Sequence, residues 1–142
     1  MKIALKESLE GVAPSQLSGF FEGWATPPTD SQLHDMLRGS YRIVLAMDGD
    51  AVVGIINAIS DGVLYSYIPL LEVKAPYRNK GIGTLLIKQL LMSLNKMYAI
   101  DLCCDDAVVA LYKQCGFTKI NGMIIRNYAN QPLSGDLDLG AQ

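Results

Sequence analysis

The chain has few of the residues from which metal sites, disulfide frameworks and thiol active sites are built. Its 142 residues include one histidine, His34, and three cysteines, Cys103, Cys104 and Cys115. Two of these cysteines are adjacent and none has metal-ligand spacing, so we expect no metal site and no disulfide framework. Adjacent strand residues face opposite sides, so Cys103 and Cys104 are not expected to line one site. Free, buried, inert thiols in a reducing cytoplasm are predicted.

The sequence also lacks long apolar runs and clusters of like charge. Twelve Lys and Arg residues against fourteen Asp and Glu give a net charge of -2, and no basic run suggests a nucleic-acid partner. No apolar run reaches the length of a membrane span. The N-terminus, 1–7, alternates and carries an early acid, which is typical of a strand rather than of a signal peptide. We therefore expect a cytoplasmic protein with no nucleic-acid and no membrane partner.

Half of the residues are hydrophobic, and the chain is long enough for one domain with a proper core. Alternation and helical spacing predict an α+β fold, with antiparallel strand pairs first and a strand-helix-strand crossover later. A single domain is expected over 1–130, followed by a polar, mobile tail over 131–142. The predicted strands are 2–9, 41–47, 51–60, 63–74, 98–103, 117–120 and 123–128, and the predicted helices are 14–21, 30–38, 81–95 and 106–115.

Two local signals modify the predicted strands: a proline inside one strand and an Asn-Gly dipeptide between two others. Pro69 interrupts the long strand 63–74 and cannot donate to a ladder, so it predicts a bulge or a splayed edge. The dipeptide Asn121-Gly122 predicts a hairpin turn between the last two strands.

The most informative segment joins the end of the predicted strand 63–74 to the strongest predicted helix, and reads Arg78-Asn79-Lys80-Gly81-Ile82-Gly83. Unpaired N–H groups at a helix start, with the helix dipole, attract anions. Glycine lets a ligand approach the backbone, and Arg78 and Lys80 add charge. The segment lacks the third glycine of a dinucleotide fingerprint and the Gly-Lys-Ser/Thr of a P-loop. It predicts a pyrophosphate site; a plain strand-to-helix turn with two glycines is the alternative.

These residues resemble the Arg/Gln-x-x-Gly-x-Gly/Ala motif of the GNAT superfamily of acyl-CoA-dependent N-acyltransferases. A second stretch, Ala110-Leu111-Tyr112-Lys113-Gln114-Cys115-Gly116-Phe117, is similar to the family's Ala-x-x-Tyr-x-x-x-Gly-Phe pattern. The resemblance covers roughly residues 1 to 128. It implies a small, single-domain bacterial-type member with the GNAT fold, a mixed, largely antiparallel twisted sheet of about six to seven strands flanked by about four helices.

The resemblance also implies chemistry: acetyl-CoA as acyl donor, no metal, and direct attack by a primary amine of a small molecule or peptide in a ternary complex. Main-chain groups of Leu71 and Val73 would pair with the pantetheine arm. Tyr112 would protonate the departing thiolate, the alternative being a tyrosine that packs beside Phe117. The implied cofactor-binding residues are Leu71, Glu72, Val73, Arg78, Asn79, Lys80, Gly81, Ile82, Gly83, Thr84 and Tyr112.

Glu72 is the candidate catalytic base, because burial in an apolar strand raises the pKa of a carboxyl group. A structural acid bonded to backbone or to an arginine is the equal alternative, with water accepting the proton. Asn79 departs from the family, which very often has glycine there, but Asn tolerates a left-handed backbone. Asp61 is expected to form a turn, and His34 to be solvated.

The acceptor site is expected from 14–40 and 61–70. Tyr65 and Tyr67 share a strand face and shape a substrate pocket or are ordinary sheet residues. The aromatics Phe20, Phe21 and Trp24 are predicted to form a satellite core. A non-catalytic acyl-CoA-binding module and a nucleotide-phosphate binder remain as rival functions, and a homodimer through the C-terminal strands is left open.

Overall fold

The computed structural model describes residues 2–131 and 133, so most of the predicted tail lies outside the described residues. Within this part, six strands form one open sheet in the order β1-β2-β3-β4-β6, and β5 pairs with β3 beside that path. Only β4 and β6 are parallel. The strands are β1 (Ile3–Lys6), β2 (Arg42–Asp48), β3 (Ala51–Ser60), β4 (Tyr65–Tyr67), β5 (Leu71–Val73) and β6 (Ala99–Asp101).

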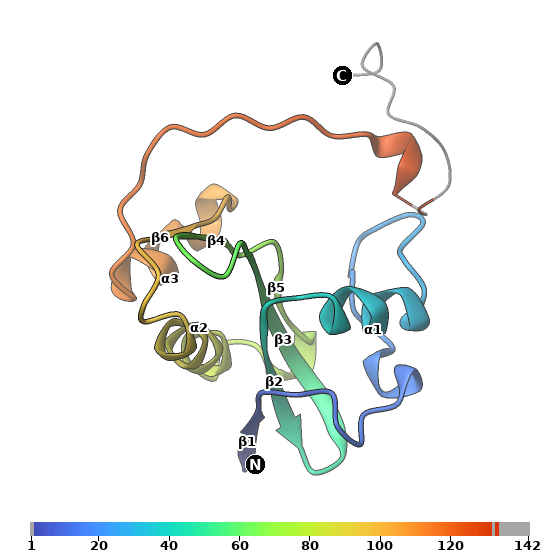
Figure 1. Cartoon of the computed structure of the whole chain (residues 1–142). Helices are drawn as coiled ribbons and strands as arrows, with labels where there is room; N and C mark the ends of the chain where they lie inside the picture. The colour runs from blue at the N-terminus through green and yellow to red at the C-terminus, as the bar shows by residue number, and fades with distance from the viewer. Residues whose placement is uncertain (1, 132, 134–142) are drawn as a thin grey trace.

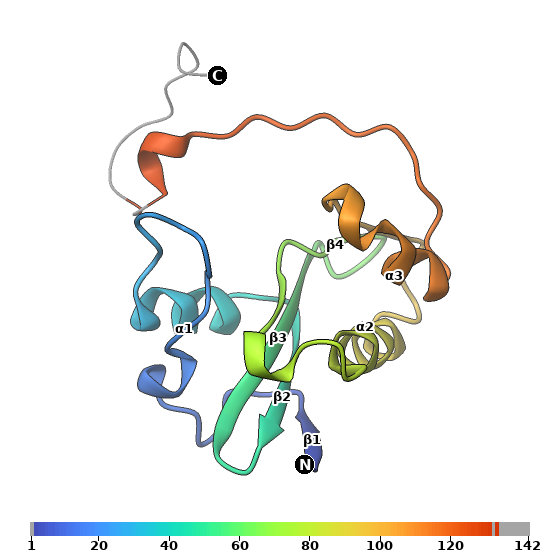
Figure 2. The same ribbon diagram turned by 180° about the vertical axis from the view of Figure 1, so that it is seen from behind.

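The helices lie on both faces of this sheet. They are α1 (Asp30–Arg38), α2 (Ile82–Ser93) and α3 (Val109–Gln114). Figure 1 shows α1 on one side of the sheet and α2 with α3 on the other, and Figure 2 shows the same arrangement from behind. The predicted α+β class with a mixed, largely antiparallel sheet is confirmed. No helix in the described part is both long and apolar enough to cross a membrane.

Local sequence signals account for the first half of the fold. Thr29 caps α1: its hydroxyl accepts from the Gln32 N–H at 3.2 Å, and the Gln32 side chain accepts from the Thr29 N–H at 2.8 Å. This reciprocal pair is a capping box. The β2–β3 hairpin turns at Gly49, whose φ of 60° suits the turn that Asp-Gly predicts.

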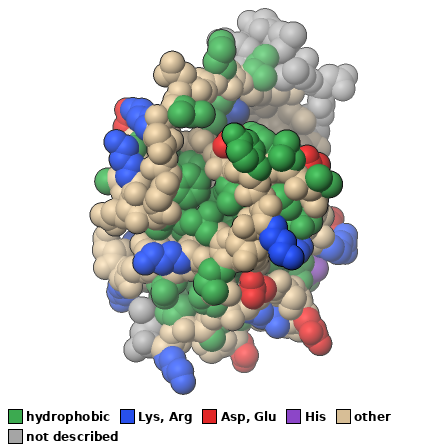
Figure 3. Space-filling model, turned by 60° about the vertical axis from the view of Figure 1, so that its left-hand side comes forward, with side chains coloured by type: hydrophobic (Ala, Val, Ile, Leu, Met, Phe, Trp, Pro, Cys, Tyr) green, Lys and Arg blue, Asp and Glu red, His purple; other side chains and the backbone are tan. Residues whose placement is uncertain are grey.

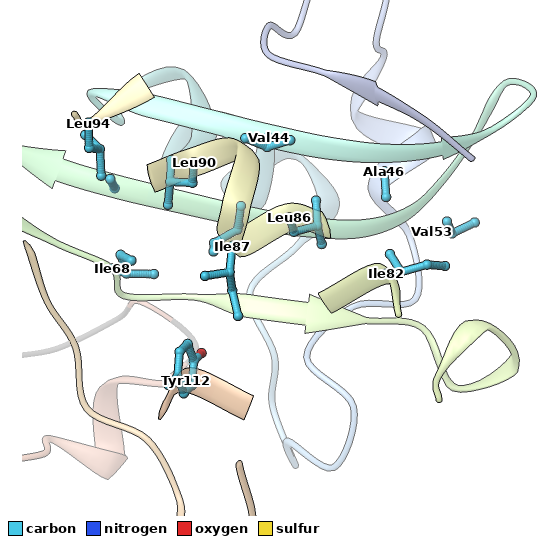
Figure 4. Close-up of a cluster of buried hydrophobic side chains, with 12 residues drawn as sticks. Val44, Ala46, Val53, Ile68, Ile82, Leu86, Ile87, Leu90, Leu94 and Tyr112 are labelled. Carbon is cyan, nitrogen blue, oxygen red and sulfur yellow. The ribbon is translucent and has the colours of Figure 1, made fainter. Parts of the chain in front are cut away.

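Helix α2 covers the sheet because β3 has no side chain at Gly54. A Cβ there would lie 3.0 Å from Leu86 Cδ1 and 3.3 Å from the Cβ of Ala46. Figure 4 shows Ile82 and Leu86 of α2 among the buried side chains of this face, with Tyr112 at the end of the cluster near Ile68 and Ile87. The close approach fixes the N-terminal turn of α2 against the centre of the sheet.

The opposite face is covered by α1 and by η1 (Pro14–Leu17), a single 3-10 turn. Phe20 and Phe21 are buried there, which confirms the predicted satellite core for these two rings. Trp24 packs on Phe21 at 4.9 Å between ring centroids but is 43% exposed.

The predicted strand 63–74 is broken into β4 and β5 at 68–70, which confirms the interruption expected at Pro69. The two pieces have different neighbours: β4 pairs with β3 and β6, whereas β5 pairs only with β3 in the described part of the chain. The sheet therefore opens between β5 and β6.

Two predictions for chain segments are wrong. The helix expected over 14–21 stops after one 3-10 turn, because Gly19, Phe21 and Gly23 all adopt positive φ, which ends a right-handed helix. The strand pair 117–120 and 123–128 does not form: residues 117–127 are in no strand, and neither Asn121 nor Gly122 has the positive φ of the predicted hairpin turn.

Candidate functional site

The free edge of β5 is the centre of the candidate site. Val53 accepts from the Lys74 N–H at 2.9 Å, and the Asn57 N–H donates to Leu70 at 3.2 Å, with Glu72 opposite Ile55 between them. In an antiparallel ladder the backbone groups of successive residues point to alternate sides. Those of 70, 72 and 74 therefore face β3, and those of Leu71 and Val73 face the opening.

The predicted phosphate turn follows this edge directly. It passes through Tyr77, whose hydroxyl donates to Asp48 Oδ2 at 2.7 Å and ties the turn to the end of β2. Asn79 has φ 60° and Gly81 has φ 82°, so Asn79 does adopt the left-handed backbone expected of it. Sequence spacing gave no sign of Tyr77, which anchors the turn from outside the motif.

Gly81 is the N-cap of α2, and its carbonyl accepts the first helical bond, from Leu85, at 3.1 Å. The N–H groups of Ile82, Gly83 and Thr84 precede that bond and have no acceptor inside the helix. A Cβ on Gly81 would meet nothing within 4 Å, and a Cβ on Gly83 would meet only Leu111 Cδ2, at 3.6 Å. The backbone at the helix start is therefore open to an anion.

The two charged residues of the motif differ in their contacts. The Arg78 Nε donates to the Val73 carbonyl at 2.8 Å, and its guanidinium is ion-paired with Glu22. Arg78 therefore links the end of β5 to the 20–24 segment. Its charge also lies beside the phosphate turn. Lys80 is exposed at the start of α2, and both cations add positive charge to the dipole end of the helix.

Tyr112 lies on α3, in the buried cluster on which Leu71 and Val73 of β5 pack. The side chain is 8% exposed, and burial, with smaller contributions from Cys104 and Cys115, raises the pKa of Tyr112 to about 12. Its ring meets Phe117 edge-on at 5.6 Å. In the described part of the chain its hydroxyl has no hydrogen-bond partner, so the predicted contact with Phe117 and a role as proton donor are compatible.

A pocket of about 570 Å³ borders Tyr112, β4, β6 and residues 117–124. Tyr65 and Tyr67 line it from one face of β4; Tyr65 donates to Asp101 Oδ2 at 2.8 Å. Interaction with Cys103 and burial raise the pKa of Tyr67. A second hollow, between residues 7–9 and the end of α1, is lined by none of the predicted catalytic or cofactor-binding residues, although Leu37, Arg38 and Ser40 belong to the predicted acceptor segment 14–40.

The cysteines depart from their prediction. Cys103 and Cys104 are exposed and both line the pocket, because they follow β6 in irregular backbone and do not alternate across a strand. Burial and the carboxylates of Asp105 and Asp106 raise the pKa of Cys104, which keeps it a thiol. Three free cysteines are otherwise as expected.

Glu72 points to the α1 face. Its Oε1 accepts from the Phe21 N–H at 2.8 Å and its Oε2 from the Glu22 N–H at 3.4 Å. Side chains alternate along a strand, and Leu71 and Val73 pack in the cluster that contains Tyr112. Glu72 and Tyr112 therefore lie on opposite faces of the sheet, and the backbone of β5 separates them.

Lys74 joins Glu72 on that face, although the sequence gave it no role. Its Nζ lies 4.8 Å from the centre of the Phe20 ring. Burial lowers the pKa of Lys74, opposed by Asp30 and Glu72. The only sign of this in the sequence is that Lys74 follows Glu72 by two residues and therefore lies on the same face of the strand.

Two further predictions can be placed. Asp61 forms a turn, since its Oδ1 accepts from the N–H groups of Val63, Leu64 and Tyr65, which lowers the pKa of Asp61. His34 is half-buried and its Nε2 lies 3.0 Å from the Val12 carbonyl oxygen, so the expectation of a solvated ring is wrong. No cluster of metal-ligating side chains occurs among the described residues.

Comparisons with known proteins agree with this geometry. Residues 9–117 match the model of the acetyltransferase (GNAT) family. The chain is 44% identical to a candidate acetyltransferase from Deinococcus radiodurans R1, covering 94% of both chains with a TM-score of 0.89. It is 31% identical to a GNAT-family acetyltransferase from Streptococcus pneumoniae TIGR4, covering 89% of this chain and 98% of that one, with a TM-score of 0.67. A search of curated proteins finds no match. The chain therefore belongs to the GNAT family of acetyltransferases.

Proposed function

We propose that this protein transfers an acetyl group from acetyl-CoA to a primary amine of a small molecule or peptide, by direct attack in a ternary complex. The observation that carries the proposal is the outer edge of β5, where the N–H and C=O groups of Leu71 and the N–H of Val73 have no strand partner among the described residues. The start of α2 follows this edge along the chain, and Tyr112 belongs to the cluster on which Leu71 and Val73 pack. A long ligand with a diphosphate at one end and a thioester at the other suits that order of groups.

The residues fit acetyl-CoA part by part. The N–H groups of Ile82, Gly83 and Thr84, with Lys80, suit the diphosphate. The outward N–H and C=O groups at Leu71 and the N–H at Val73 suit the amides of the pantetheine arm. Gly83 of α2 lies against Leu111 of α3, the residue before Tyr112. The helix that begins at the phosphate turn therefore packs on the helix that carries the proposed proton donor.

Acetyl-CoA supplies an acetyl group already activated as a thioester. In the transfer the amine nitrogen bonds to the carbonyl carbon, the carbon–sulfur bond breaks and the sulfur takes up a proton. Tyr112 holds such a proton at Oη, because its pKa of about 12 keeps the hydroxyl neutral at physiological pH. Backbone N–H groups on the β5 edge polarise the carbonyl without a charged side chain.

The proton lost by the amine needs a different acceptor. Glu72 is the candidate base from the sequence, but both its oxygens already accept backbone N–H groups. Taking up a proton would weaken those bonds. We therefore assign Glu72 the second role that the sequence left open, that of positioning the 20–24 segment, and assign proton removal to water.

An acyl-CoA-binding module without catalysis is the second candidate, favoured by the engagement of Glu72. One assay separates the two functions: release of free CoA thiol from acetyl-CoA, measured over a panel of amines and peptides, with binding followed by calorimetry. Turnover with at least one amine supports the transferase, whereas binding without turnover supports the module. If ATP competes as well as CoA, the site is instead a nucleotide-phosphate site.

A further inference from the structure

The pocket between β4, β6 and residues 117–124 has a volume of about 570 Å³, which is in the range of small-molecule sites. Tyr112, the proposed proton donor, is part of its lining, so a molecule in this pocket shares a cavity with the group proposed to meet the thioester sulfur. Figure 3, which turns the left-hand side of Figure 1 forward, shows hydrophobic side chains in a central hollow. The pocket is therefore the place in which the acceptor amine would lie.

The lining of this pocket is rich in aromatic rings. Four rings contribute to it: Tyr65, Tyr67, Tyr112 and Phe117. The face of an aromatic ring attracts cations, and more strongly where water is excluded. Aromatic rings also provide large apolar surfaces on which the methylene chain of an aliphatic amine can pack. This composition favours an aliphatic ligand that carries a positive charge.

Asp101 adds a negative charge among these rings. In the parallel pair of β4 and β6 it lies opposite Tyr67, and its Oδ2 accepts from the Tyr65 hydroxyl at 2.8 Å. That bond raises the pKa of Tyr65, which keeps its hydroxyl a donor. A carboxylate has two oxygens that each accept more than one hydrogen bond. The bond from Tyr65 therefore fixes the carboxylate in the pocket and leaves it the capacity to bind an ammonium or guanidinium group.

The other charged side chains of the lining differ from Asp101 in exposure. Lys113, Lys119 and Asp106 are exposed, whereas Asp101 is half-buried. Arg126, which is also exposed, acts by its charge on the second of the two β4 tyrosines. Exposed charges are screened by water and salt, and partly buried charges are screened much less. Asp101 is therefore the charge that a ligand inside the pocket meets most strongly.

We propose that the acceptor is an amine with a second, cationic group, and that Asp101 binds this second group beside Tyr65 and Tyr67. The inference rests on the proposed transfer to an amine and names the class of amine. The bound cation is not the nitrogen that is acetylated, because that nitrogen must be neutral to attack and a neighbouring carboxylate would favour its protonated form. Diamines, and molecules or peptides with a second basic group, are thus the expected substrates.

Three acceptors of equal chain length test this selectivity on the unmodified protein: pentane-1,5-diamine, pentylamine and 5-aminopentanoate. We expect kcat/KM for the diamine to exceed that for pentylamine at least about tenfold, as a charge-assisted hydrogen bond predicts. This is more than the factor of about two that its two equivalent ends supply. 5-Aminopentanoate should be the poorest, because its carboxylate would face Asp101. Equal values for the diamine and pentylamine would overturn the inference and leave the transferase function intact.

The substitution Asp101→Asn tests the residue, because asparagine removes the charge and keeps an oxygen that accepts from Tyr65. For the diamine, kcat/KM should fall to about the pentylamine value. Pentylamine itself should change by less than about twofold, which also shows that the variant folds. The matched control is Asp106→Asn, which removes an exposed charge from the same lining and should keep the preference. A diamine preference that survives Asp101→Asn, or is lost equally in Asp106→Asn, would overturn the assignment to Asp101.

Calorimetry separates the failure of this inference from the failure of the proposed function. Pentane-1,5-diamine is titrated, with CoA present, into the unmodified protein and into an Asp101→Asn variant with the same circular dichroism. We expect the diamine dissociation constant to be at least about tenfold higher for the variant, whether or not any amine is acetylated. If no amine turns over but this difference is found, the transferase proposal is wrong and the cation site stands. If the diamine binds both proteins equally, or binds neither, the cation site is wrong.

Discussion

The carboxylate of Glu72 holds Phe21 in a left-handed backbone conformation. Phe21 has φ 63°, rare for an aromatic residue, and its N–H donates to Glu72 Oε1 at 2.8 Å. The bond links β5, which carries the proposed cofactor edge, to the 20–24 segment on the other face of the sheet. A side chain that would be chosen from the sequence as a base is thus also the support of a strained turn.

Substitution Glu72→Gln separates these roles. Glutamine keeps an oxygen that accepts from Phe21 but loses basicity, so kcat/KM should fall by less than about threefold, whereas loss of a general base typically costs about 10²- to 10⁴-fold. The control is Glu72→Ala, which removes the acceptor and should destabilise the fold by about 2 kcal/mol, measured by urea unfolding. A hundredfold slower but stable Gln variant would identify Glu72 as the base.

Substitution Tyr112→Phe tests the proton donor. The ring and its edge-on contact with Phe117 remain, and only the hydroxyl is lost. We expect kcat to fall about 10²-fold, the usual contribution of a positioned acid, while calorimetric affinity for acetyl-CoA stays within about twofold because the phosphate turn is untouched. A Phe variant with the activity of the parent would assign Tyr112 to packing alone.

Tyr112→Phe should also change how the free energy of unfolding depends on pH. The pKa of Tyr112 is raised from 10.0 to about 12 in the folded protein, so above pH 10 the folded state holds a proton that the unfolded state has lost. Stability from this group is complete below pH 10 and is lost as pH rises towards 12, with a slope of up to about 1.4 kcal/mol per pH unit. Urea unfolding at pH 9 and 11 should show a steeper loss for the parent than for Tyr112→Phe; equal losses would mean that the hydroxyl is not buried as the structure has it.

Local rules predicted the elements that local interactions determine. The predicted helix 30–38 begins at a capping box on Thr29, and the predicted strands 41–47 and 51–60 are joined by a turn at Gly49. These features, like the predicted break at Pro69 and the predicted left-handed Asn79, depend on a few consecutive residues. The backbone conformation of the turn 78–83 belongs to the same class. Its role in binding a diphosphate follows from the first turn of one helix and stays a prediction. These parts of the fold were readable from the sequence.

Contacts between distant segments were not readable. Nothing near Glu72 in the sequence marks the Phe21 amide, 51 residues away, that occupies its carboxylate. The pairing of 117–120 with 123–128 was predicted from a good turn sequence and an apolar pattern, yet the structure leaves the turn open. Alternation identifies a strand but not its partner.

The last prediction concerns Gly83, where alanine should raise stability and leave acetyl-CoA binding nearly unchanged. A Cβ there would make only an ordinary contact, 3.6 Å from Leu111 Cδ2, and φ at Gly83 is not positive. Alanine in a helix is more favourable than glycine by about 0.5 to 1 kcal/mol, so Gly83→Ala should unfold at higher urea concentration. The same methyl group would stand beside the N–H groups proposed to hold the diphosphate, but the GNAT motif accepts alanine at this position, so we expect the acetyl-CoA dissociation constant to stay within about twofold.

The matched control is Gly39→Ala at the end of α1, which also has no positive φ and lies on the other face of the sheet. It should leave acetyl-CoA affinity unchanged. If Gly83→Ala instead weakens acetyl-CoA binding about tenfold or more while Gly39→Ala does not, the ligand approaches this backbone more closely than the alanine of the motif would allow. The proposed fit of the diphosphate to the Arg/Gln-x-x-Gly-x-Gly/Ala pattern would then be wrong, even if the protein proves to be an acetyltransferase.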